Sequence, residues 1–483
     1  MATGYVPPAH LTIMTRLCFV SLMAVLMAFT ATVSGAPTGL LTNILAPVTT
    51  VVTTAIAPKD VVVVFWASNT AALGSVNATA DILTEPERIA NIVTLVSALK
   101  LLAQTTQAGV IALLTGLIYE IFWINNTILI KNCPSVVANL INALPEVKEV
   151  VDNLIITLDP IQPTADSTNN TAAAGWGATK IQAPNVWASG FTGQNVVVAT
   201  IDSGVRGTHD ALKNNFLGPY GWYDPANKTA TPYDDNGHGT HTMGSIAGGL
   251  GVGIAPGVKW MSCKGCGSTS CSLSLLTACA QFVLCPTDTT GNSCNAAKAP
   301  HIVSNSWGAG QGLTYFQSNL DAWYSARIIP VFASGNSGSS GCSSVVSPGD
   351  AAKAFAVGAT DINDALGSFS SLGPALNGLV KPNFAGPGVS IRSAWNGNNS
   401  DYLSLSGTSM AAPHLAGTIA LALSARSGFC FDSMKAVLSG STDQTLPKAA
   451  LTCGGTTDTT FPNNQYGYGR INAVNAVNSA VAY

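Results

Sequence analysis

Charged side chains are scarce in this sequence. Asp, Glu, Lys and Arg make up 9% of the 483 residues, whereas about 25% is usual for soluble domains. The formal net charge is only −3, so the chain lacks the positive surplus that binding to nucleic acid or to an anionic membrane requires. We therefore expect neither partner. The low charge and the 47 Gly residues favour a compact extracellular protein.

Glutamate is absent from residues 176–483, which hold 15 Lys and Arg against 14 Asp, a balance of +1. Residues 37–175 hold all five Glu and carry five Lys and Arg against ten acidic residues, a balance of −5. A chain of this length is also too long for one ordinary domain. The break in composition predicts two separate units, of which the first can be detached.

The N-terminal region has the layout of an export signal. Arg16 precedes an apolar run that ends in the small residues of 31–36. We expect residues 1–36 to be a signal peptide and the protein to be secreted. The thirteen residues before Met14 are unusual for a signal peptide, so a start of translation at Met14 rather than at Met1 is a second hypothesis. The alternative is a membrane anchor, because the uncharged run 17–36 is long enough to span a bilayer. Its polar end and the lack of a following basic cluster favour secretion without a stable membrane anchor.

Cysteine usage agrees with export. Nine of the eleven Cys follow the front segment, and six of these crowd between Cys263 and Cys294. In an oxidising compartment most should pair, and an odd number leaves one thiol free. Cys263 and Cys266 have a zinc-type spacing, but no His lies nearby at ligand spacing. The one pair that we predict is Cys430 with Cys453, which flank the last loop.

Five Asn-x-Ser/Thr sequons permit glycosylation in a eukaryotic host. They begin at Asn77, Asn125, Asn169, Asn227 and Asn398.

Residues 60–158 predict a small α+β unit. The patterns indicate a strand at 60–66, a helix at 86–107, a strand pair or one bent strand at 122–130, a helix at 134–144 and a strand at 147–158. The order β-α-β-β-α-β is that of a split ferredoxin-like fold. The apolar patch 110–130 contains Glu120, so we read it as core rather than as a membrane span. Residues 159–174 read as an exposed linker open to cleavage.

From Gly175 onward, strands alternate with helices, which predicts a parallel sheet covered on both faces. Strands are expected at 195–201, 258–263, 301–304, 327–333, 354–358 and 389–392, and helices at 239–248, 273–284, 314–326 and 409–425. Ligands bind such sheets beyond the carboxyl ends of the strands. Three polar clusters follow three of the expected strands, at Asp202, at 305–308 and at 334–336. We therefore expect these clusters to meet at one edge.

Three motifs supply an acid, an imidazole and a hydroxyl in chain order. Asp202 ends the run Val197–Ile201, His238 lies in Asp-Asn-Gly-His-Gly-Thr-His, and Ser409 lies in Gly-Thr-Ser-Met-Ala-Ala-Pro-His. Alone, each has an ordinary structural explanation: a turn cap, a loop histidine and a helix N-cap. Together they match a device in which a carboxylate orients a histidine that activates a serine.

These motifs resemble those of the subtilisin-like serine peptidases, or subtilases, over about Trp176–Val477. Residues 233–244 and 299–307 are most similar to the bacillopeptidase F-like branch. The resemblance implies an α/β fold, a subtilisin-like parallel sheet with helices on both faces. It also implies a peptidase domain at 175–483, preceded by a ferredoxin-like propeptide at 37–174.

The resemblance assigns the chemistry. Ser409 is the expected nucleophile, His238 the base and later the acid, and Asp202 the group that orients the imidazole. Asn336 matches the family's side-chain donor to the oxyanion. Losing that donor costs about 3 kcal/mol in another member of the family. Its structural alternative is a turn residue beside Gly335. His241 and His414 match non-catalytic positions.

Substrate recognition is implied to be mostly main-chain. One side of the cleft is expected at Ser306, Trp307 and Gly308. The other wall of the primary pocket is expected at Ala333, Ser334 and Gly335. Small wall residues imply a roomy apolar pocket, so we expect a broad endopeptidase that prefers apolar or aromatic side chains before the cut.

Expected partners are protein or peptide substrates and the chain's own propeptide, acting as folding template and intramolecular inhibitor. The alternative for the front unit is a small independent domain that stays attached. We expect a monomer whose chemistry needs no cofactor. Structural calcium is expected from the family, although no run of ligands stands out and its residues are unknown.

Two rival functions remain open. The first is a catalytically silent subtilase-fold binding protein, which usually lacks a triad member, whereas this chain keeps all three and Asn336. The second is a lipid-type hydrolase, which would show Gly-x-Ser-x-Gly and the order Ser, Asp, His. The region around Ser409 has neither feature.

Overall fold

The computed structural model describes residues 57–76, 82–158, 163–164, 175–448 and 450–483. The predicted signal peptide at 1–36 and most of the predicted linker at 159–174 lie outside the described residues. The chain forms two compact units. Among the described residues, the smaller unit comprises 57–67, 103–122 and 126–153, and the larger comprises 68–76, 82–102, 123–125, 154–158, 163–164, 175–448 and 450–483.

The smaller unit is built on a four-stranded antiparallel sheet in the order β2-β3-β1-β4. Its strands are β1 (Lys59–Phe65), β2 (Ile118–Phe122), β3 (Thr127–Cys133) and β4 (Val147–Asp152), with helix α5 (Ser135–Asn142) between the last two. Alternate residues Val61, Val63 and Phe65 of β1 are buried in one core, as the two-residue period of a strand requires. The element order and strand order match the predicted ferredoxin-like arrangement.

Of the two alternatives predicted for 122–130, the strand pair is confirmed: β2 and β3 form an antiparallel hairpin, and Asn126 adopts a left-handed φ of 54° at its turn. One detail of the smaller unit differs from the prediction. The last predicted strand is broken after Asp152, and its second half is the short strand β5 (Ile155–Thr157), which belongs to the larger unit.

Helix α4 (Glu85–Ala112) has 28 residues and is long and apolar enough to cross a membrane by length and composition. Its residues Ile92, Leu95, Val96 and Leu99 are buried, at the spacing of one helical face. Packing therefore accounts for that apolar stripe. Val93 is 52% exposed, because it lies about 100° away from Ile92 around the helix.

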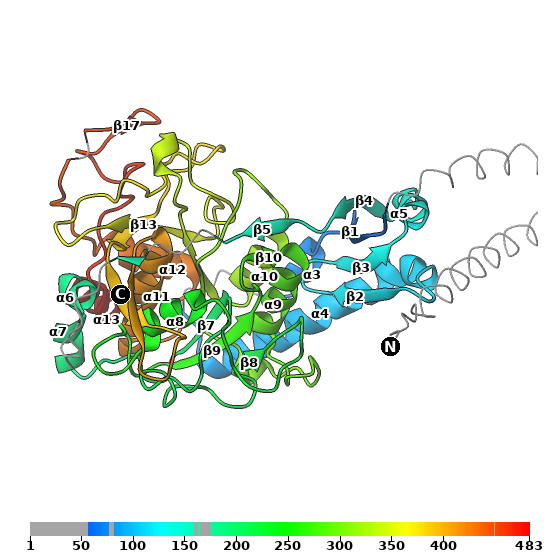
Figure 1. Ribbon diagram of the computed structural model, residues 1–483, viewed down its shortest axis with the longest axis horizontal. Helices are drawn as coiled ribbons and strands as arrows, with labels where there is room; N and C mark the ends of the chain where they lie inside the picture. The colour runs from blue at the N-terminus through cyan, green and yellow to red at the C-terminus, as the bar shows by residue number, and fades with distance from the viewer. Residues whose placement is uncertain (1–56, 77–81, 159–162, 165–174, 449) are drawn as a thin grey trace, which may run out of the picture. The chain divides into compact units, whose positions relative to one another are not determined.

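The larger unit contains a seven-stranded parallel sheet in the order β14-β13-β12-β11-β7-β9-β8 (Figure 1). The strands are β7 (Val197–Asp202), β8 (Trp222–Tyr223), β9 (Lys259–Lys264), β11 (Ile302–Asn305), β12 (Ile329–Ala333), β13 (Phe355–Thr360) and β14 (Phe384–Pro387). Strands β11, β12, β13 and β14 are buried along their whole length, as expected for a parallel sheet covered on both faces. The predicted fold class is confirmed.

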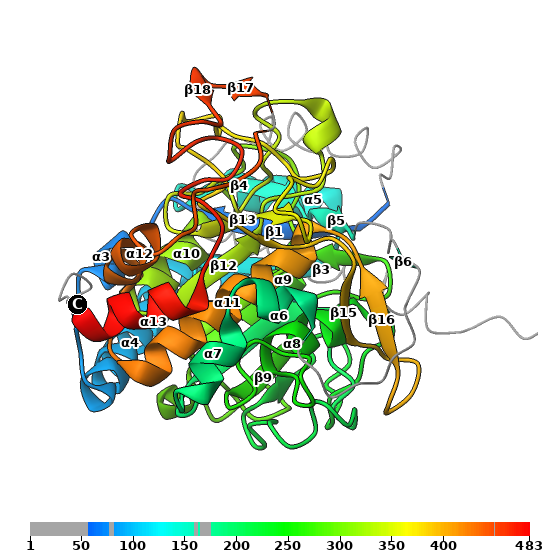
Figure 2. The ribbon, with the colours of Figure 1, turned by 90° about the vertical axis from the view of Figure 1, so that its left-hand side faces the viewer.

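Helices pack on both faces of this sheet (Figures 1 and 2). On one face, α8 (His238–Ala247) and α11 (Thr408–Ala425) contact the strands, and α13 (Ala473–Ala482) packs on α11. On the other face lie α9 (Leu273–Leu284) and α10 (Gln317–Ser325). Helix α11 is buried from Thr408 to Leu423, so the helix that carries Ser409 is also the centre of the core.

One strand prediction was wrong. Residues 389–392 do not join the parallel sheet. The overlapping strand β15 (Ile391–Ala394) instead pairs with β16 (Tyr402–Leu405) in a separate antiparallel sheet. The edge position in the parallel sheet belongs to β14, Phe-Ala-Gly-Pro, whose Gly and Pro give a weak strand signal.

The described cysteines form four disulfides: Cys263–Cys279, Cys266–Cys271, Cys285–Cys294 and Cys342–Cys453. The predicted Cys430–Cys453 pair is therefore wrong. Cys430 is a buried thiol whose sulfur accepts the N–H of Ser433 at 3.4 Å and caps helix α12 (Phe431–Ser439). The expectation of one free thiol among the last nine Cys is confirmed.

Candidate active site

The parallel sheet brings the predicted polar clusters to one edge. Asp202 is the last residue of β7, Asn305 the last of β11 and Ala333 the last of β12, and these strands are neighbours. Because all three run in the same direction, their carboxyl ends lie side by side. The three clusters that follow them therefore share that edge, as predicted.

Asp202 and His238 are in direct contact. Asp202 is 1% exposed, and its Oδ1 lies 2.8 Å from Nδ1 of His238, the first residue of α8. The same carboxylate accepts the N–H of Ser203 at 2.7 Å and the hydroxyl of Thr242 at 3.3 Å. Since an ionised carboxylate only accepts, the ring donates from Nδ1, and Nε2 is left as the basic nitrogen.

Glycine at position 239 is what allows α8 to begin so close to β7. A Cβ there would lie 2.1 Å from the carbonyl oxygen of Gly204 and 3.1 Å from Cβ of Asp202. The first is far inside van der Waals contact, so any larger residue would push the helix, and His238 with it, away from the carboxylate.

Ser409 lies at the start of α11, with a backbone N–H at the positive end of the helix. Its Oγ donates to the carbonyl oxygen of Ser306 at 3.3 Å, and Ser306 Oγ donates back to the carbonyl of Ser409 at 3.0 Å. Ser306 directly follows β11, the neighbour of β7, and α8 packs against α11. The nucleophile candidate is therefore held at the same edge as the Asp202–His238 pair. The bond between His238 and Ser409 themselves stays a prediction.

Asn336 is oriented by the residue before Ser409. Its Oδ1 accepts both the N–H and the hydroxyl of Thr408, each at 2.9 Å, and the Thr408 hydroxyl accepts the N–H of Gly335 at 3.1 Å. These contacts fix the amide with its oxygen toward Thr408, so the NH2 group points elsewhere. The sequence singled out Asn336 but not Thr408, whose only signal is its place in the Gly-Thr-Ser run.

The side chain of Trp307 is buried, so only its main chain is left to contact a substrate. The residue is 4% exposed, its indole N–H donates to the carbonyl of Ile201 at 3.0 Å, and its ring packs edge-on against Phe316 and Phe332. On the other predicted wall, Ser334 is fully buried. Side chains from these two positions therefore belong to the core.

Val346 lies between the two predicted walls, and sequence reasoning missed it. A Cβ on Gly308 would lie 2.6 Å from Cγ2 of Val346. A Cβ on Gly335 would lie 3.0 and 3.1 Å from its two methyl groups. The isopropyl group is thus adjacent to both glycines.

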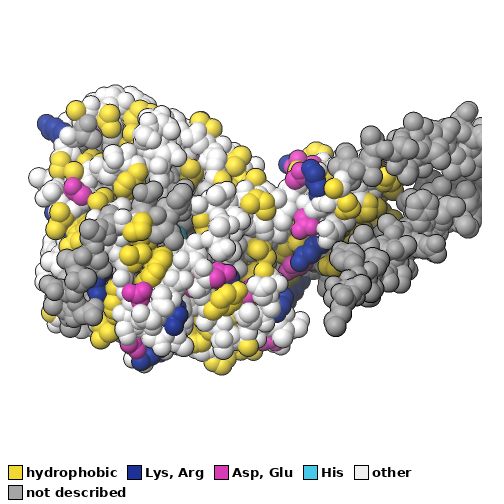
Figure 3. All heavy atoms as spheres, in the orientation of Figure 1, with side chains coloured by type: hydrophobic (Ala, Val, Ile, Leu, Met, Phe, Trp, Pro, Cys, Tyr) yellow, Lys and Arg dark blue, Asp and Glu magenta, His cyan; other side chains and the backbone are white. Residues whose placement is uncertain are grey.

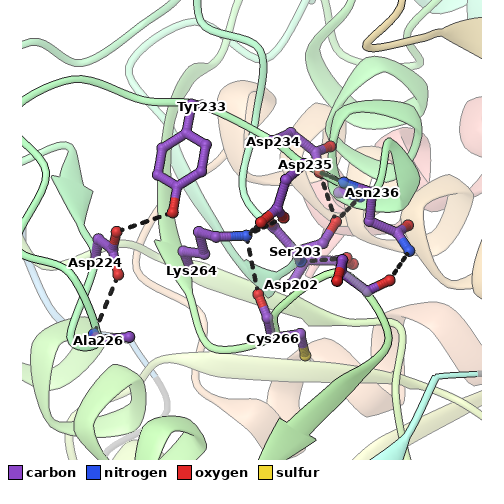
Figure 4. A network of polar contacts seen from close by, with 12 residues as sticks. Asp202, Ser203, Asp224, Ala226, Tyr233, Asp234, Asp235, Asn236, Lys264 and Cys266 are labelled. Atoms are coloured by element: carbon purple, nitrogen blue, oxygen red, sulfur yellow. Dashed lines mark hydrogen bonds and ion pairs between the residues drawn. The ribbon is translucent and has the colours of Figure 1, made fainter. Parts of the chain in front are cut away.

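Lys264, the last residue of β9 and the register partner of Asp202, supports the site from behind (Figure 4). Its side chain is 4% exposed. The ammonium donates to the carbonyl of Ser203 at 2.5 Å, to Asp235 Oδ1 at 2.6 Å and to the carbonyl of Cys266 at 3.1 Å. Lys264 therefore links Ser203, which follows Asp202, to Asp235 in the loop before His238. The signal in the sequence was a lysine ending an apolar strand.

Asp234 braces the same loop (Figure 4). Its Oδ1 accepts the Ser203 hydroxyl at 3.0 Å and the N–H groups of Asn236 and Gly237 at 3.0 and 2.9 Å. Its Oδ2 accepts the N–H and hydroxyl of Thr240 at 2.9 and 2.6 Å. The turn before His238 is thus tied to the residue after Asp202.

The disulfide loop Cys266–Cys271 touches this arrangement at two points. The N–H of Cys266 donates to the carbonyl of Asp202 at 3.1 Å, and the Asn236 side chain donates to the carbonyl of Ser268 at 2.6 Å. The loop leads into the edge strand β10 (Ser270–Ser272). The Cys266–Cys271 disulfide therefore restrains both β10 and the backbone of Asp202.

His241 and His414 are buried structural residues. His241 Nε2 lies 3.0 Å from the carbonyls of Ile391 and Leu403, and His414 Nδ1 lies 2.8 Å from the carbonyl of Met410. Burial lowers the pKa of His241 to about 3 and that of His414 to about 4. Both rings are therefore neutral in the folded protein at neutral pH.

The sequence suggested structural calcium from the family resemblance, and a calcium site needs several oxygen ligands around one point. Within the described ranges, no group of three or more His, Cys, Asp or Glu side chains is placed to hold a metal. Two buried clusters of oxygen atoms each surround a lysine ammonium group, that of Lys264 and that of Lys381. Lys381 donates to the carbonyls of Ala351 and Ala354, each at 2.7 Å, and burial lowers its pKa to about 7.

The buried histidines predict acid-sensitive stability. A histidine whose pKa is lower in the folded than in the unfolded state favours unfolding once it is protonated. Its contribution is complete above the unfolded pKa of about 6.5 and is lost as the pH falls toward 4. Between pH 7 and pH 5, His414 should account for about 2 kcal/mol of lost unfolding free energy. Urea titrations of Ser409→Ala, alone and with His414→Gln, should show a smaller loss in the double variant. Equal losses would contradict this.

Comparison with known proteins supports the motifs. Residues 193–469 match the subtilase family, Peptidase S8. Bacillopeptidase F of Bacillus subtilis is 35% identical over 364 residues, covering 69% of this chain and 24% of that protein. The serine protease AprX of the same species is 33% identical over 325 residues, covering 59% of this chain and 67% of that one. Alkaline serine exoprotease A of Vibrio alginolyticus is 31% identical over 304 residues, covering 61% and 51%.

This chain thus spans about a quarter to two thirds of the length of these relatives. The likeness to Bacillopeptidase F agrees with the predicted branch. The family match covers more than half of the chain and includes Asp202, His238, Asn336 and Ser409. The protein belongs to the subtilase family.

Proposed function

We propose that this protein is a secreted serine endopeptidase that cuts peptide bonds through an acyl-enzyme. The observation that carries the proposal is the 2.8 Å contact between Asp202 and His238, at the sheet edge where Ser306 also holds Ser409. Secretion follows from the predicted signal peptide and suits the four disulfides.

The proposed reaction uses these groups in turn. His238 Nε2 takes the proton of Ser409 Oγ as the oxygen attacks the substrate carbonyl carbon. The oxyanion that forms accepts from the Asn336 NH2 group and from the Ser409 N–H at the helix N-terminus. His238 then protonates the leaving amine, which breaks the peptide bond and leaves the acyl group on Ser409. Water then attacks the acyl carbon as His238 takes one of its protons. The bond from that carbon to Ser409 Oγ breaks, His238 returns the proton to Oγ, and the acid product leaves.

Asp202 supports both proton transfers. It holds the imidazole in the tautomer with Nε2 free and stabilises the cation that forms on His238. Because Asp202 is buried and accepts three hydrogen bonds, its carboxylate is held in place while His238 gains and loses its proton.

The protein is proposed to be a zymogen that occupies its own cleft. Strand β5 (Ile155–Thr157) pairs antiparallel with the edge strand β10, and β6 (Pro163–Thr164) pairs with Ser404 and Leu405 of β16, just before Ser409. Adding an extended segment to an edge strand is a general way of binding peptides. The front segment would thus block substrate, and the maturation cut would fall between Thr157 and Pro163.

Specificity is proposed to be broad, with a preference for apolar side chains before the cut. Val346 limits the size of the side chain that the primary pocket should accept. Its methyl groups contact the positions of Gly308 and Gly335 on the two implied walls, so small aliphatic side chains should fit there better than aromatic ones.

Activity is tested by covalent labelling. The processed wild-type protein should react with a fluorophosphonate, and Ser409→Ala should neither react nor process. The mature N-terminus should begin within residues 158–163. A wild type that is processed but unlabelled would contradict catalysis and support a silent binding protein.

The role of Val346 is tested with matched peptides that differ only in the residue before the cut. Val346→Gly should raise kcat/KM for Phe relative to Ala by at least about tenfold, because the space of three carbons is opened. Val345→Ala, a truncation of the neighbouring buried valine, is the control for general loosening. A ratio that stays constant in Val346→Gly would show that another residue limits the pocket.

Lys264 should act on turnover by positioning Asp202 and His238. Lys264→Met is expected to lower kcat about 10²-fold with little change in KM, since small misplacements of catalytic groups have effects of that size. The control is Lys381→Met, which removes an equally buried ammonium with three oxygen acceptors but no link to Asp202. Equal losses of kcat in both variants would make Lys264 merely structural.

A further inference from the structure

The segment 346–350 lies between the two implied walls of the primary pocket, and we call it the pocket floor. Val346, its first residue, is adjacent to a glycine of each wall. The N–H of Val346 donates to the carbonyl of Ser334 at 3.0 Å, and the carbonyl of Val346 accepts the N–H of Asp350 at 3.1 Å. The floor is therefore a closed turn that is bonded directly to the wall at 333–335.

The pocket floor is also paired with the residues that follow Gly308 on the other wall. The N–H of Ala309 donates to the carbonyl of Ser347, and the N–H of Ser347 donates to the carbonyl of Gly310, each at 3.0 Å. These two bonds form a short antiparallel bridge between Ala309 and Ser347. The separation of Gly308 from Val346 therefore depends on how firmly this bridge is closed.

The loop 309–313 after Gly308 has little rigidity of its own. Gly310 and Gly312 are both exposed and have left-handed φ values of 57° and 64°, and Leu313 is 41% exposed. Glycine leaves the backbone free to adopt many conformations, and a loop with few buried apolar contacts opens easily. The wall at Gly308 therefore needs a restraint from outside the loop.

Asp350 provides that restraint through one oxygen. Its Oδ2 accepts the N–H of Gly312 and the hydroxyl of Ser347, each at 2.7 Å, and Ser347 Oγ accepts the N–H of Leu313 at 2.9 Å. Asp350 is 6% exposed and Ser347 is fully buried, so water competes little for these bonds. The distances are those of well-formed hydrogen bonds, and leaving such buried groups unpaired is costly. The side chain of Asp350 therefore fastens the loop 309–313 to the pocket floor.

The other end of the pocket floor is held independently. The buried ammonium group of Lys381 donates to the carbonyls of Ala351 and Ala354, which lie just beyond the floor, each at 2.7 Å. Removing the carboxylate of Asp350 would leave these bonds in place. The part of the pocket that it would release is therefore the loop 309–313.

We propose that Asp350 is a positioning residue for substrate specificity, which sets the width of the primary pocket by holding the loop 309–313 against the pocket floor. This inference rests on the proposed function, since the pocket belongs to the proposed peptidase. While the loop is held, Gly308 stays next to the methyl groups of Val346, and the pocket admits small aliphatic side chains. Once the loop is released, the wall at Gly308 moves outward and the pocket admits larger side chains.

The test compares processed proteins made from the full chain, with matched peptides that differ only in the residue before the cut. Asp350→Ala should raise the ratio of kcat/KM for Phe to kcat/KM for Ala at least about fivefold over wild type, mainly because KM for the Ala peptide rises. Asp350→Asn keeps an oxygen acceptor for the same two donors and should stay within about twofold of the wild-type ratio. Because both variants remove the carboxylate charge, their difference reports the hydrogen bonds.

Two further variants separate a pocket effect from a general loosening of the fold. Asp443→Ala removes a carboxylate that accepts from Arg470 and Asn472 instead of from the pocket loop, and it should leave the ratio unchanged even where it lowers stability. In Val346→Gly the space is already open, so adding Asp350→Ala should change the ratio by less than about twofold.

The outcomes keep the two proposals apart. A wild type that cleaves none of the peptides and does not react with a fluorophosphonate would defeat the proposed function. A wild type that cleaves them, with the same ratio in Asp350→Ala, would overturn the role of Asp350 alone. An equal shift of the ratio in Asp443→Ala or in Asp350→Asn would overturn it as well. If Asp350→Ala fails to fold, Ser347→Ala removes the hydroxyl that links Leu313 to the carboxylate. The ratio should then rise at least about threefold, and an unchanged ratio would overturn the inference.

Discussion

The hydrogen bond between Asp202 and His238 depends on how closely β7 and α8 approach each other. Glycine at 239 permits the approach, and Asp234 and Lys264 hold the intervening loop in place. Asp234 and Lys264 both bond to Ser203, which follows Asp202, and to the turn that precedes His238. The pair is therefore positioned by three chain segments at once, and each is anchored to the parallel sheet or to a disulfide.

A chain with few charges places several of them inside. The face of the molecule in Figure 3 carries only scattered charged side chains. Buried ones include Arg88, Asp202, Lys264 and Lys381, and each has several hydrogen-bond partners. Burying an ion is unfavourable unless its hydrogen bonds are satisfied. The hydrogen bonds of these four side chains therefore offset the cost of burying them.

Much of this could be predicted from the sequence. Asp202, His238 and Ser409 stand in local motifs, and the apolar runs placed most of the parallel strands within a few residues. Lys264 and Val346 were missed because their importance comes from neighbours brought in by the fold: Ser203 and Asp235 in one case, two glycines in the other. Strand β14 was missed because its pairing with β13 overrides a weak local preference. The Cys342–Cys453 bridge joins a loop to the short strand β17 (Thr452–Cys453), and no spacing in the sequence reveals that the two are close.

That bridge has a topological consequence. It joins positions 111 residues apart, and the ring it closes contains all of α11. A single backbone nick anywhere inside the ring, by self-digestion or by a neighbouring molecule, would leave the two fragments covalently joined. The serine helix would remain tethered to the rest of the body, with the chance to re-form its contacts rather than diffuse away.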